Sequence, residues 1–385
     1  MEWITDTDSL KAACADLAQA DFVAVDTEFM RETTFWPKLC LIQAAGGDRE
    51  LLIDPLSEAL DLAPFWELMA DESVLKVFHA CRQDIEIFYH QGGQLIPSPM
   101  FDTQVAAMAV GLGDSISYDN LVRALLGRNV DKGSRFTDWS RRPLSDKQAA
   151  YALADVTLLR DLFPLLQQKL AEVGRESWLA EEMTIITDPA TYRMDPEDAW
   201  KRLKLRKTTP KWLAALKAAA RWREIEAQTR DIPRSRIIKD DGLYEIAHAA
   251  PTSTEELAQL RAVPKGFERS KPAERLIEAL REALADPKAH APDIEKPAPA
   301  PPNVGPVLEM LKVFLKVVAE QEGVAARLIA TVPDLEQLAA SDEADIPALK
   351  GWRRQVFGAQ ALRLKRGEFA LVLENGRVEA VELED

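Results

Sequence analysis

The chain has 385 residues, of which 47% are hydrophobic and 29% are charged, and its formal net charge is −15. This length exceeds one typical domain and predicts two or three, each able to bury its own core. Taken alone, the acidity argues against a nucleic-acid binder, which usually carries a basic surface. The charge is uneven, however: residues 1–200 carry −17, residues 201–300 carry +6 and residues 301–385 carry −4.

The cysteines and the apolar segments indicate a cellular compartment. Cys14, Cys40 and Cys81 are an odd number without paired spacing, which argues against a disulfide framework and a CxxC zinc site. The first residues lack the basic and apolar segments of a signal peptide. No apolar run approaches the roughly 20 residues that span a bilayer. We therefore expect a cytoplasmic protein with no membrane partner.

The first third of the chain mixes strand and helix patterns. Residues 21–25, 39–43, 50–54 and 74–78 are predicted as short buried strands, and the short connections between the first three favour antiparallel neighbours. From about Asp102 onward, apolar residues recur at spacings of three and four, as in helices. Residues 1–188 are therefore predicted to form an α/β domain.

The remainder of the chain is predicted to be helical. Residues 206–287 indicate a domain of several short helices, and residues 288–306 form a proline-rich linker that we expect to be extended and semi-rigid. Residues 307–385 indicate a further helical unit. It ends in a predicted hairpin, because Asn375-Gly376 is a turn pair that tolerates positive φ at both positions.

Carboxylates recur in three separate segments. Asp26 and Glu28 lie two apart at the end of a strand, so their side chains project to the same side. Asp84 follows the strand at 74–78, and Tyr151 and Asp155 are four apart on a helix and share a face. Each alone has an ordinary explanation: a polar strand end, a first helical turn stabilised by the helix dipole, or an exposed pair.

Together, the three segments resemble the three motifs of the DEDDy family of 3′–5′ exonucleases. Their order and spacing match, including His79 five residues before Asp84 and Phe88 four residues after it. The resemblance implies a ribonuclease-H-like α/β fold, with a mixed sheet flanked by helices. It also implies that Tyr151 orients the attacking water. It assigns metal binding, and with Tyr151 catalysis, to Asp26, Glu28, Asp84 and Asp155.

The chemistry of phosphodiester hydrolysis explains these residue types. Negative charge develops on an already anionic centre, and two divalent cations about 4 Å apart stabilise the attacking and leaving oxygens. Mg²⁺ and Mn²⁺ prefer carboxylate oxygens to thiols. Tyrosine ordinarily titrates near 10 and is a poor base, so we expect it to position the water, with a metal lowering the pKa of that water.

The sequence segments around the motifs, residues 39–44, 100–107 and 131–151, resemble the ribonuclease D family more closely. We interpret Asp102 as a helix N-cap outside the metal set. The basic residues of the last segment could contact phosphate or simply face solvent. Trp139 is more consistent with an anchor in the core than with a stacking surface. The candidate RNA contacts in this segment are Lys132, Arg135, Arg141 and Arg142.

The basic middle of the chain resembles a second module. Residues 201–250 hold 13 basic and 6 acidic side chains, and Lys204, Arg206 and Lys207 are candidate RNA contacts. Residues 216–257 resemble the helicase-and-ribonuclease-D C-terminal (HRDC) domain, a small helical bundle that binds nucleic acid. Its expected core is Trp222, Leu243, Ile246 and Leu257.

The tail resembles a second, diverged HRDC-like unit. It is acidic and lacks the helix with the Trp-Arg pair. Binding of nucleic acid and packing against the catalytic domain are therefore both open for this unit. The arrangement of one DEDDy domain followed by two HRDC-like units is that of the ribonuclease D family.

The leading hypothesis is a monomeric 3′→5′ exoribonuclease that uses two Mg²⁺ or Mn²⁺ ions. The resemblance implies release of 5′-mononucleotides and maturation of tRNA precursors and other small structured RNAs. Two alternatives are a DNA-directed DEDDy exonuclease in repair and a catalytically silent RNA-binding module. A helicase is disfavoured because the phosphate-loop motif GxxxxGK[ST] is missing from the sequence. The overall acidity predicts weak, salt-sensitive RNA binding.

Overall fold

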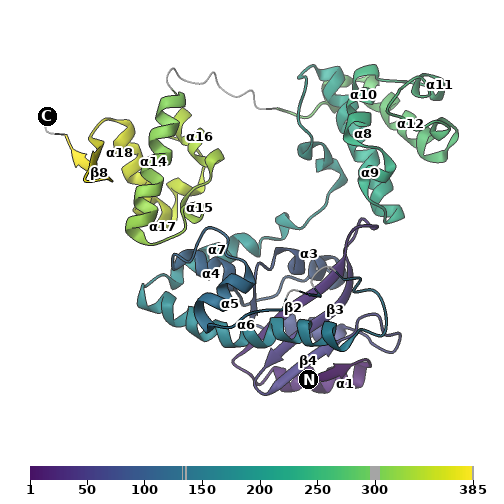
Figure 1. Cartoon of the computed structure of the whole chain (residues 1–385). Coiled ribbons are helices and arrows are strands. Elements are labelled where there is room, and N and C mark those ends of the chain that lie inside the picture. Colours follow the sequence, from purple (N-terminus) through teal and green to yellow (C-terminus); the bar gives the residue numbers. More distant parts are fainter. Residues whose placement is uncertain (132, 135–136, 295–303, 384–385) are drawn as a thin grey trace.

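A computed structural model describes residues 1–131, 133–134, 137–294 and 304–383. Figure 1 shows three parts: an α/β unit in purple to teal, a green helical unit and a yellow-green helical unit. We call them the nuclease unit, the HRDC unit and the C-terminal unit. No helix in the described residues is long and apolar enough to cross a membrane.

The nuclease unit contains a six-stranded mixed sheet in the order β1-β4-β3-β2-β5-β6. β2 pairs with β3 and β3 with β4 in antiparallel fashion, which confirms the predicted pairing. The pairs β1·β4, β2·β5 and β5·β6 are parallel. The strands are β1 Glu2–Ile4, β2 Phe22–Met30, β3 Lys38–Gly46, β4 Arg49–Ile53, β5 Leu75–Phe78 and β6 Met100–Asp102.

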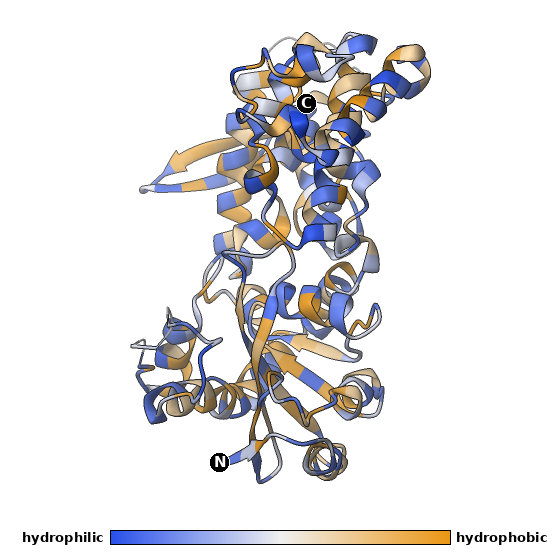
Figure 2. Cartoon of the chain, turned by 90° about the vertical axis from the view of Figure 1, so that its right-hand side faces the viewer, coloured by the Kyte–Doolittle hydropathy of each residue, from blue (hydrophilic) through white to orange (hydrophobic). Residues whose placement is uncertain are grey.

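In the described part of the nuclease unit, seven α-helices surround this sheet, whose strands are largely hydrophobic in Figure 2. The longest, α6, packs along β2, β3 and β4. It begins at a capping box in which Ser145 and Gln148 satisfy each other's backbone N–H groups. The helices are α1 Thr7–Leu17, α2 Ala63–Ala70, α3 Arg82–Gln91, α4 Thr103–Ala109, α5 Tyr118–Leu126, α6 Asp146–Glu172 and α7 Glu176–Ile186.

The HRDC unit is built on one long helix, α8, rather than on short helices alone. The prediction of several short helices was wrong for α8, which has 21 residues, and for α12, which has 15. The Ala-, Lys- and Arg-rich run has high helix propensity, which favours one continuous helix. All four predicted core residues are buried. The elements are η1 Pro189–Thr191, η2 Pro196–Arg202, α8 Pro210–Arg230, α9 Arg234–Ile237, α10 Asp240–Ala249, α11 Thr254–Leu257, η3 Phe267–Arg269, α12 Lys271–Ala285 and α13 Pro287–His290.

The C-terminal unit repeats the helix order of the HRDC unit. α8, α9 and α10 have 21, 4 and 10 residues, and α14, α15 and α16 have 19, 4 and 9. This parallel supports the prediction of a diverged second copy. The elements are α14 Val304–Glu322, α15 Ala326–Ile329, α16 Val332–Ala340, η4 Pro347–Leu349, α17 Gly351–Arg353, η5 Arg354–Gly358, α18 Ala359–Lys365, β7 Phe369–Glu374 and β8 Arg377–Glu382.

Two predictions for the end of the chain have different outcomes. The hairpin is confirmed: β7 pairs with β8, and Asn375 and Gly376 adopt φ values of 50° and 79°. The predicted linker 288–306 is helical at both ends, because α13 includes residues 288–290 and α14 begins at Val304. Residues 295–303 of this linker lie outside the described part of the chain.

The hydrophobic clusters do not coincide with the three units of the chain. One continuous cluster runs from the nuclease unit into the C-terminal unit. A second cluster fills the HRDC unit and also includes Phe35 from the β2–β3 loop. The C-terminal unit is therefore built onto the nuclease unit, whereas the HRDC unit has a core of its own.

Candidate active site

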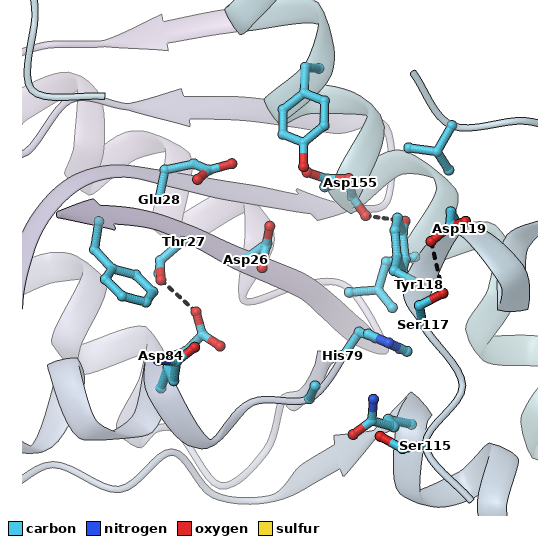
Figure 3. A pocket seen from close by; sticks show the side chains of 17 residues that line it. Asp26, Thr27, Glu28, His79, Asp84, Ser115, Ser117, Tyr118, Asp119 and Asp155 are labelled. Carbon is cyan, nitrogen blue, oxygen red and sulfur yellow. Dashed lines mark hydrogen bonds between the residues drawn. The ribbon is translucent and has the colours of Figure 1, made fainter. Parts of the chain in front are cut away.

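The second half of β2 supplies two carboxylates to a pocket of about 550 Å³, because the strand runs to Met30 and does not end before Asp26 as the sequence suggested. Asp26 and Glu28 both line this pocket, as expected for residues two apart on a strand. The pairing of β2 with β3 shifts register between Glu28 and Phe29, directly after the second carboxylate. Figure 3 shows Asp26 between Glu28 and Asp84, with Asp155 across the pocket.

Two helices bring the other predicted residues to the same pocket. Asp84 lies in the first turn of α3 and accepts a hydrogen bond from the Thr27 hydroxyl. Tyr151 and Asp155 lie one turn apart on α6, and both line the pocket. The structure therefore brings together all five residues that the sequence motifs singled out.

Burial and mutual repulsion make the ionised carboxylates unfavourable. Loss of solvation raises the pKa of Asp26 to about 6, against a smaller opposing effect of a backbone hydrogen bond from Thr27. The pKa of Asp84 is raised well above its usual value, first by burial and then by the nearby charge of Asp26. Nearby cations would relieve both effects, because they favour the charged form.

The opposite wall of the pocket is formed by neutral polar groups and Asp119. The Tyr118 hydroxyl donates a hydrogen bond to the backbone carbonyl of Asp155. The Ser117 hydroxyl donates to Asp119 over 2.8 Å. His79 lies with Nδ1 3.0 Å from the Thr103 hydroxyl oxygen, and burial lowers the pKa of its imidazole. Figure 3 shows His79, Ser115, Ser117, Tyr118 and Asp119 on this side.

Sequence reasoning did not identify this wall as part of the site. His79 could have been identified, because it lies five residues before Asp84 in the motif. Ser115, Ser117 and Tyr118 belong to a loop and a helix start whose sequence resembles an ordinary helix cap. Only the fold brings them opposite β2.

The carboxylates share a pocket without forming a closed ligand shell. Among the described residues, no three acidic, histidine or cysteine side chains converge closely enough to enclose a metal ion. The donor set nevertheless fits hard divalent cations, since it consists of carboxylate oxygens without a thiol.

Asp102 is the helix cap that the sequence predicted. Its carboxylate accepts from the backbone N–H of Gln104 over 2.8 Å at the start of α4. It also accepts from the N–H groups of Ala80 and Cys81, at 3.0 and 2.9 Å. These contacts hold the loop between β5 and α3, and Asp102 is outside the lining of the pocket.

Comparison with known proteins identifies the modules. Residues 1–171 match a family model described as 3′-5′ exonuclease, and residues 213–283 match the HRDC domain. The chain is 52% identical over 382 residues to Ribonuclease D of Nitrobacter hamburgensis, covering 99% of this chain and 100% of the relative. It is 48% identical to Ribonuclease D of Granulibacter bethesdensis over 98% and 96% of the two chains. The chain belongs to the ribonuclease D family.

A solved structure agrees with this assignment across the three units. The crystal structure of Escherichia coli RNase D, an exoribonuclease involved in structured RNA processing, superposes with a TM-score of 0.82 at 28% identity. The match covers 95% of this chain and 98% of that one. Membership of the ribonuclease D family makes this chain a 3′–5′ exoribonuclease, a hydrolase of phosphodiester bonds.

Among the predicted RNA contacts near the site, Arg142 is a structural residue instead. Its guanidinium donates to both carboxylate oxygens of Asp54, each over 2.6 Å. The remaining N–H groups bind the backbone carbonyls of Cys40, Trp139 and Arg141. All five donors of the guanidinium are thereby used, so none is left for a phosphate.

The other candidates of this ribonuclease D segment differ in position. Arg141 is 83% exposed and pairs with Asp138. Trp139 is only 2% exposed, which confirms its interpretation as an anchor. Lys132 and Arg135 lie outside the residues that the structure describes.

The candidates on the HRDC unit are all exposed. Arg206 pairs with Asp241 over 3.2 Å and stacks on the Tyr244 ring, 3.7 Å from its centroid. Lys207 lies 2.9 Å from the His248 ring nitrogen. Lys204 lies in the segment before α8. These side chains are accessible to a phosphate backbone.

Proposed function

We propose that this exoribonuclease hydrolyses RNA from the 3′ end with two divalent cations, Mg²⁺ or Mn²⁺, and releases 5′-mononucleotides. We further propose that its substrates include tRNA precursors and other 3′-extended structured RNAs, and that it acts as a cytoplasmic monomer. The single observation that carries the chemistry is the gathering of four carboxylates from β2, α3 and α6 in one pocket.

The raised pKa values of Asp26 and Asp84 support cation binding. Burial and their mutual repulsion disfavour ionisation of the two carboxyl groups, and bound divalent cations would favour their charged form. The cations, when bound, would stabilise the charge on the attacking and leaving oxygens. Thr27 holds the Asp84 carboxylate in place, and the α6 backbone holds Asp155 one turn from Tyr151.

Tyr151 fits the role of a positioning group for water. Its ring lies 6.0 Å from that of the buried Trp139, which limits its freedom. A phenol O–H can donate a hydrogen bond to water, so we assign Tyr151 to orienting the attacking water rather than to deprotonating it.

Substrate binding away from the pocket is proposed for the HRDC unit. Lys204, Arg206 and Lys207 are exposed cations on the most basic stretch of the chain. Contacts of this kind attract the phosphate backbone without reading its sequence. In the nuclease unit, Arg141 is the remaining candidate RNA contact within the part of the chain that the structure describes.

The chemistry is tested with purified protein, a tRNA precursor carrying a 3′ extension, and Mg²⁺ or Mn²⁺. We expect 5′-mononucleotides by chromatography, and complete loss of product in excess chelator. Asp155→Asn should reduce the rate by about 10³-fold or more, since several kcal/mol of charge stabilisation is lost. Asp161→Asn is the matched control, because Asp161 lies on the same helix but pairs with Arg128 at the surface.

The outcomes separate the proposal from its alternatives. Activity that survives chelation, or an Asp155→Asn variant as active as Asp161→Asn, would overturn the two-cation mechanism. Faster degradation of a DNA strand than of the RNA strand of matched sequence would favour a DNA-directed enzyme. Binding of RNA without any cleavage, together with no binding of Mn²⁺ at millimolar concentration, would favour a silent RNA-binding module.

A further inference from the structure

One wall of the active-site pocket belongs to the loop between α4 and α5. Ser115 and Ser117 in this loop, and Tyr118 at the start of α5, line the pocket beside Asp155 and across from Asp26, Glu28 and Asp84 (Figure 3). The loop contains Gly111 and Gly113 at φ values of 77° and 111°, which leaves its backbone few steric restraints. The placement of this wall therefore depends on what holds the loop.

The C-terminal unit contacts both the last turn of α4 and this loop. The backbone N–H of Ala325 donates to the Met108 carbonyl over 2.9 Å. The backbone N–H of Arg327 donates to the Asp114 carboxylate over 3.2 Å. Two segments more than 200 residues apart in the sequence are thus joined on both sides of Gly111.

Gly111 itself lies against the end of α14. A Cβ atom placed on Gly111 would be 2.5 Å from the carbonyl oxygen of Gly323. That contact is far shorter than van der Waals distance and involves backbone, which moves less easily than a side chain. The structure therefore leaves no space for a side chain at position 111 while the two units stay docked.

Arg175 links the two sides from the start of α7. It is only 8% exposed, and its guanidinium donates to the Ala109 carbonyl over 2.8 Å and to the Gly323 carbonyl over 3.2 Å. It also donates to the Glu322 carbonyl and stacks on Trp178. A single buried cation thus satisfies carbonyls of both α4 and α14.

We propose that the C-terminal unit is a positioning element of the nuclease site. Its segment 322–327 holds residues 108–114, and this fixes the Ser115–Asp119 wall against which the 3′-terminal nucleotide must lie. Gly111 and Asp114 are positioning residues, since neither lines the pocket. The inference concerns the exonuclease activity of the family and requires neither a particular RNA nor a particular number of cations.

The first experiment uses full-length Gly111→Ala and a matched control, Gly127→Ala. Gly127 also has a positive φ of 65° but faces open space, so it reproduces the backbone strain without the clash. In Gly111→Ala we expect at least fivefold faster hydrogen exchange in a peptide covering residues 112–119, with the exchange of β2 and β3 unchanged. The KM for a trinucleotide, a minimal substrate, should rise at least fivefold.

A second variant does not perturb the backbone. Asp114→Ala removes the acceptor for Arg327, and Asp114 is exposed, so we expect the protein to fold. Asp48→Ala is the matched control, an exposed acidic residue in the β3–β4 turn. We expect Asp114→Ala to raise the trinucleotide KM two- to threefold and to speed exchange in residues 112–119, and Asp48→Ala to change neither.

Two results would overturn the proposal. The first is Gly111→Ala and Asp114→Ala matching their controls in both exchange and KM. The second is faster exchange throughout the nuclease unit in both variants, which would indicate a general stabilising contact. Hydrogen exchange needs no turnover, so its result stands even if the proposed two-cation mechanism fails.

Discussion

The HRDC unit and the C-terminal unit have the same order of helices but attach to the nuclease unit in different ways. The HRDC unit has its own hydrophobic cluster, which includes the buried Phe35 of the nuclease unit and packs against its neighbour Trp36. The C-terminal unit shares one continuous cluster with the nuclease unit. A repeated fold can therefore serve as a separate module in one copy and as part of the catalytic unit in the other.

The contacts at the two junctions explain this difference. At the C-terminal unit, Trp352 stacks on Trp178 with centroids 4.0 Å apart, and Arg353 pairs with Glu182 where both side chains are nearly buried. At the HRDC unit, Asp231 accepts hydrogen bonds from the backbone N–H groups of Phe35 and Trp36. The first junction joins two cores in one cluster, whereas the second inserts a single aromatic loop, whose backbone Asp231 also holds by hydrogen bonds.

The largest expected effect comes from removing one tryptophan in each unit. Trp352→Ala should lower the stability of the nuclease unit by about 3–5 kcal/mol, because a buried aromatic ring of the shared core is lost. Trp222→Ala removes a tryptophan of equal burial. It should lower only the midpoint temperature of a separate unfolding transition of the HRDC unit. Calorimetry measures both transitions. A single transition shifted equally by both variants would show that the two units are not thermodynamically distinct.

A pH dependence separates the nuclease unit from the HRDC unit. The pKa of Asp26 is raised to about 6 in the folded protein, so stability from this group is present below its ordinary pKa and is lost as pH rises from about 4 to 6. In chelator, Asp26→Asn should therefore stabilise the nuclease transition by about 1–3 kcal/mol at pH 7 and hardly at all near pH 4. The HRDC transition should not differ between the two proteins. A stabilisation that is equal at both pH values would contradict the proposed burial effect.

A smaller effect is expected at the polar junction. Asp231 has a positive φ of 46°, so Asp231→Gly removes the acceptor without adding strain. We expect the amides of Phe35 and Trp36 to lose about 1–2 kcal/mol of protection in hydrogen exchange. Asp231→Asn keeps an acceptor oxygen and should retain most of this protection. Equal protection in the wild type and the glycine variant would mean that the packing of Phe35 and Trp36 holds the junction without Asp231.

The smallest effect concerns RNA affinity. It tests whether the HRDC unit binds RNA and the C-terminal unit does not. Arg206→Ala should weaken binding of a long RNA about threefold. It should also reduce the slope of log K against log salt concentration by about one. Arg366→Ala in the C-terminal unit is the matched control, because the two arginines are 54% and 52% exposed and both pair with an acidic residue. Filter binding at several salt concentrations measures both. Equal losses would show that the C-terminal unit also contacts RNA.

Much of the site could be predicted because its residues lie on regular elements. The alternation of a strand places Asp26 and Glu28 on one side, and the helical repeat places Tyr151 and Asp155 on one face. The longer strands and the Asn375-Gly376 turn followed from equally local patterns. The three-residue strands β1 and β6 were not predicted, since so short a segment carries no recognisable alternation.

The sequence by itself determined which residues to expect at the site, because side-chain type and the spacing within each motif can be read along the chain. Only the tertiary structure decided what those residues face and which contacts hold them. Arg142 looked like a phosphate contact, but long-range packing places it on Asp54. The loop before Tyr118 carries no local signal, yet in the structure it lines the same pocket as Asp26 and also contacts the C-terminal unit. Contacts between distant segments depend on how whole units pack, and that information is not contained in any one segment.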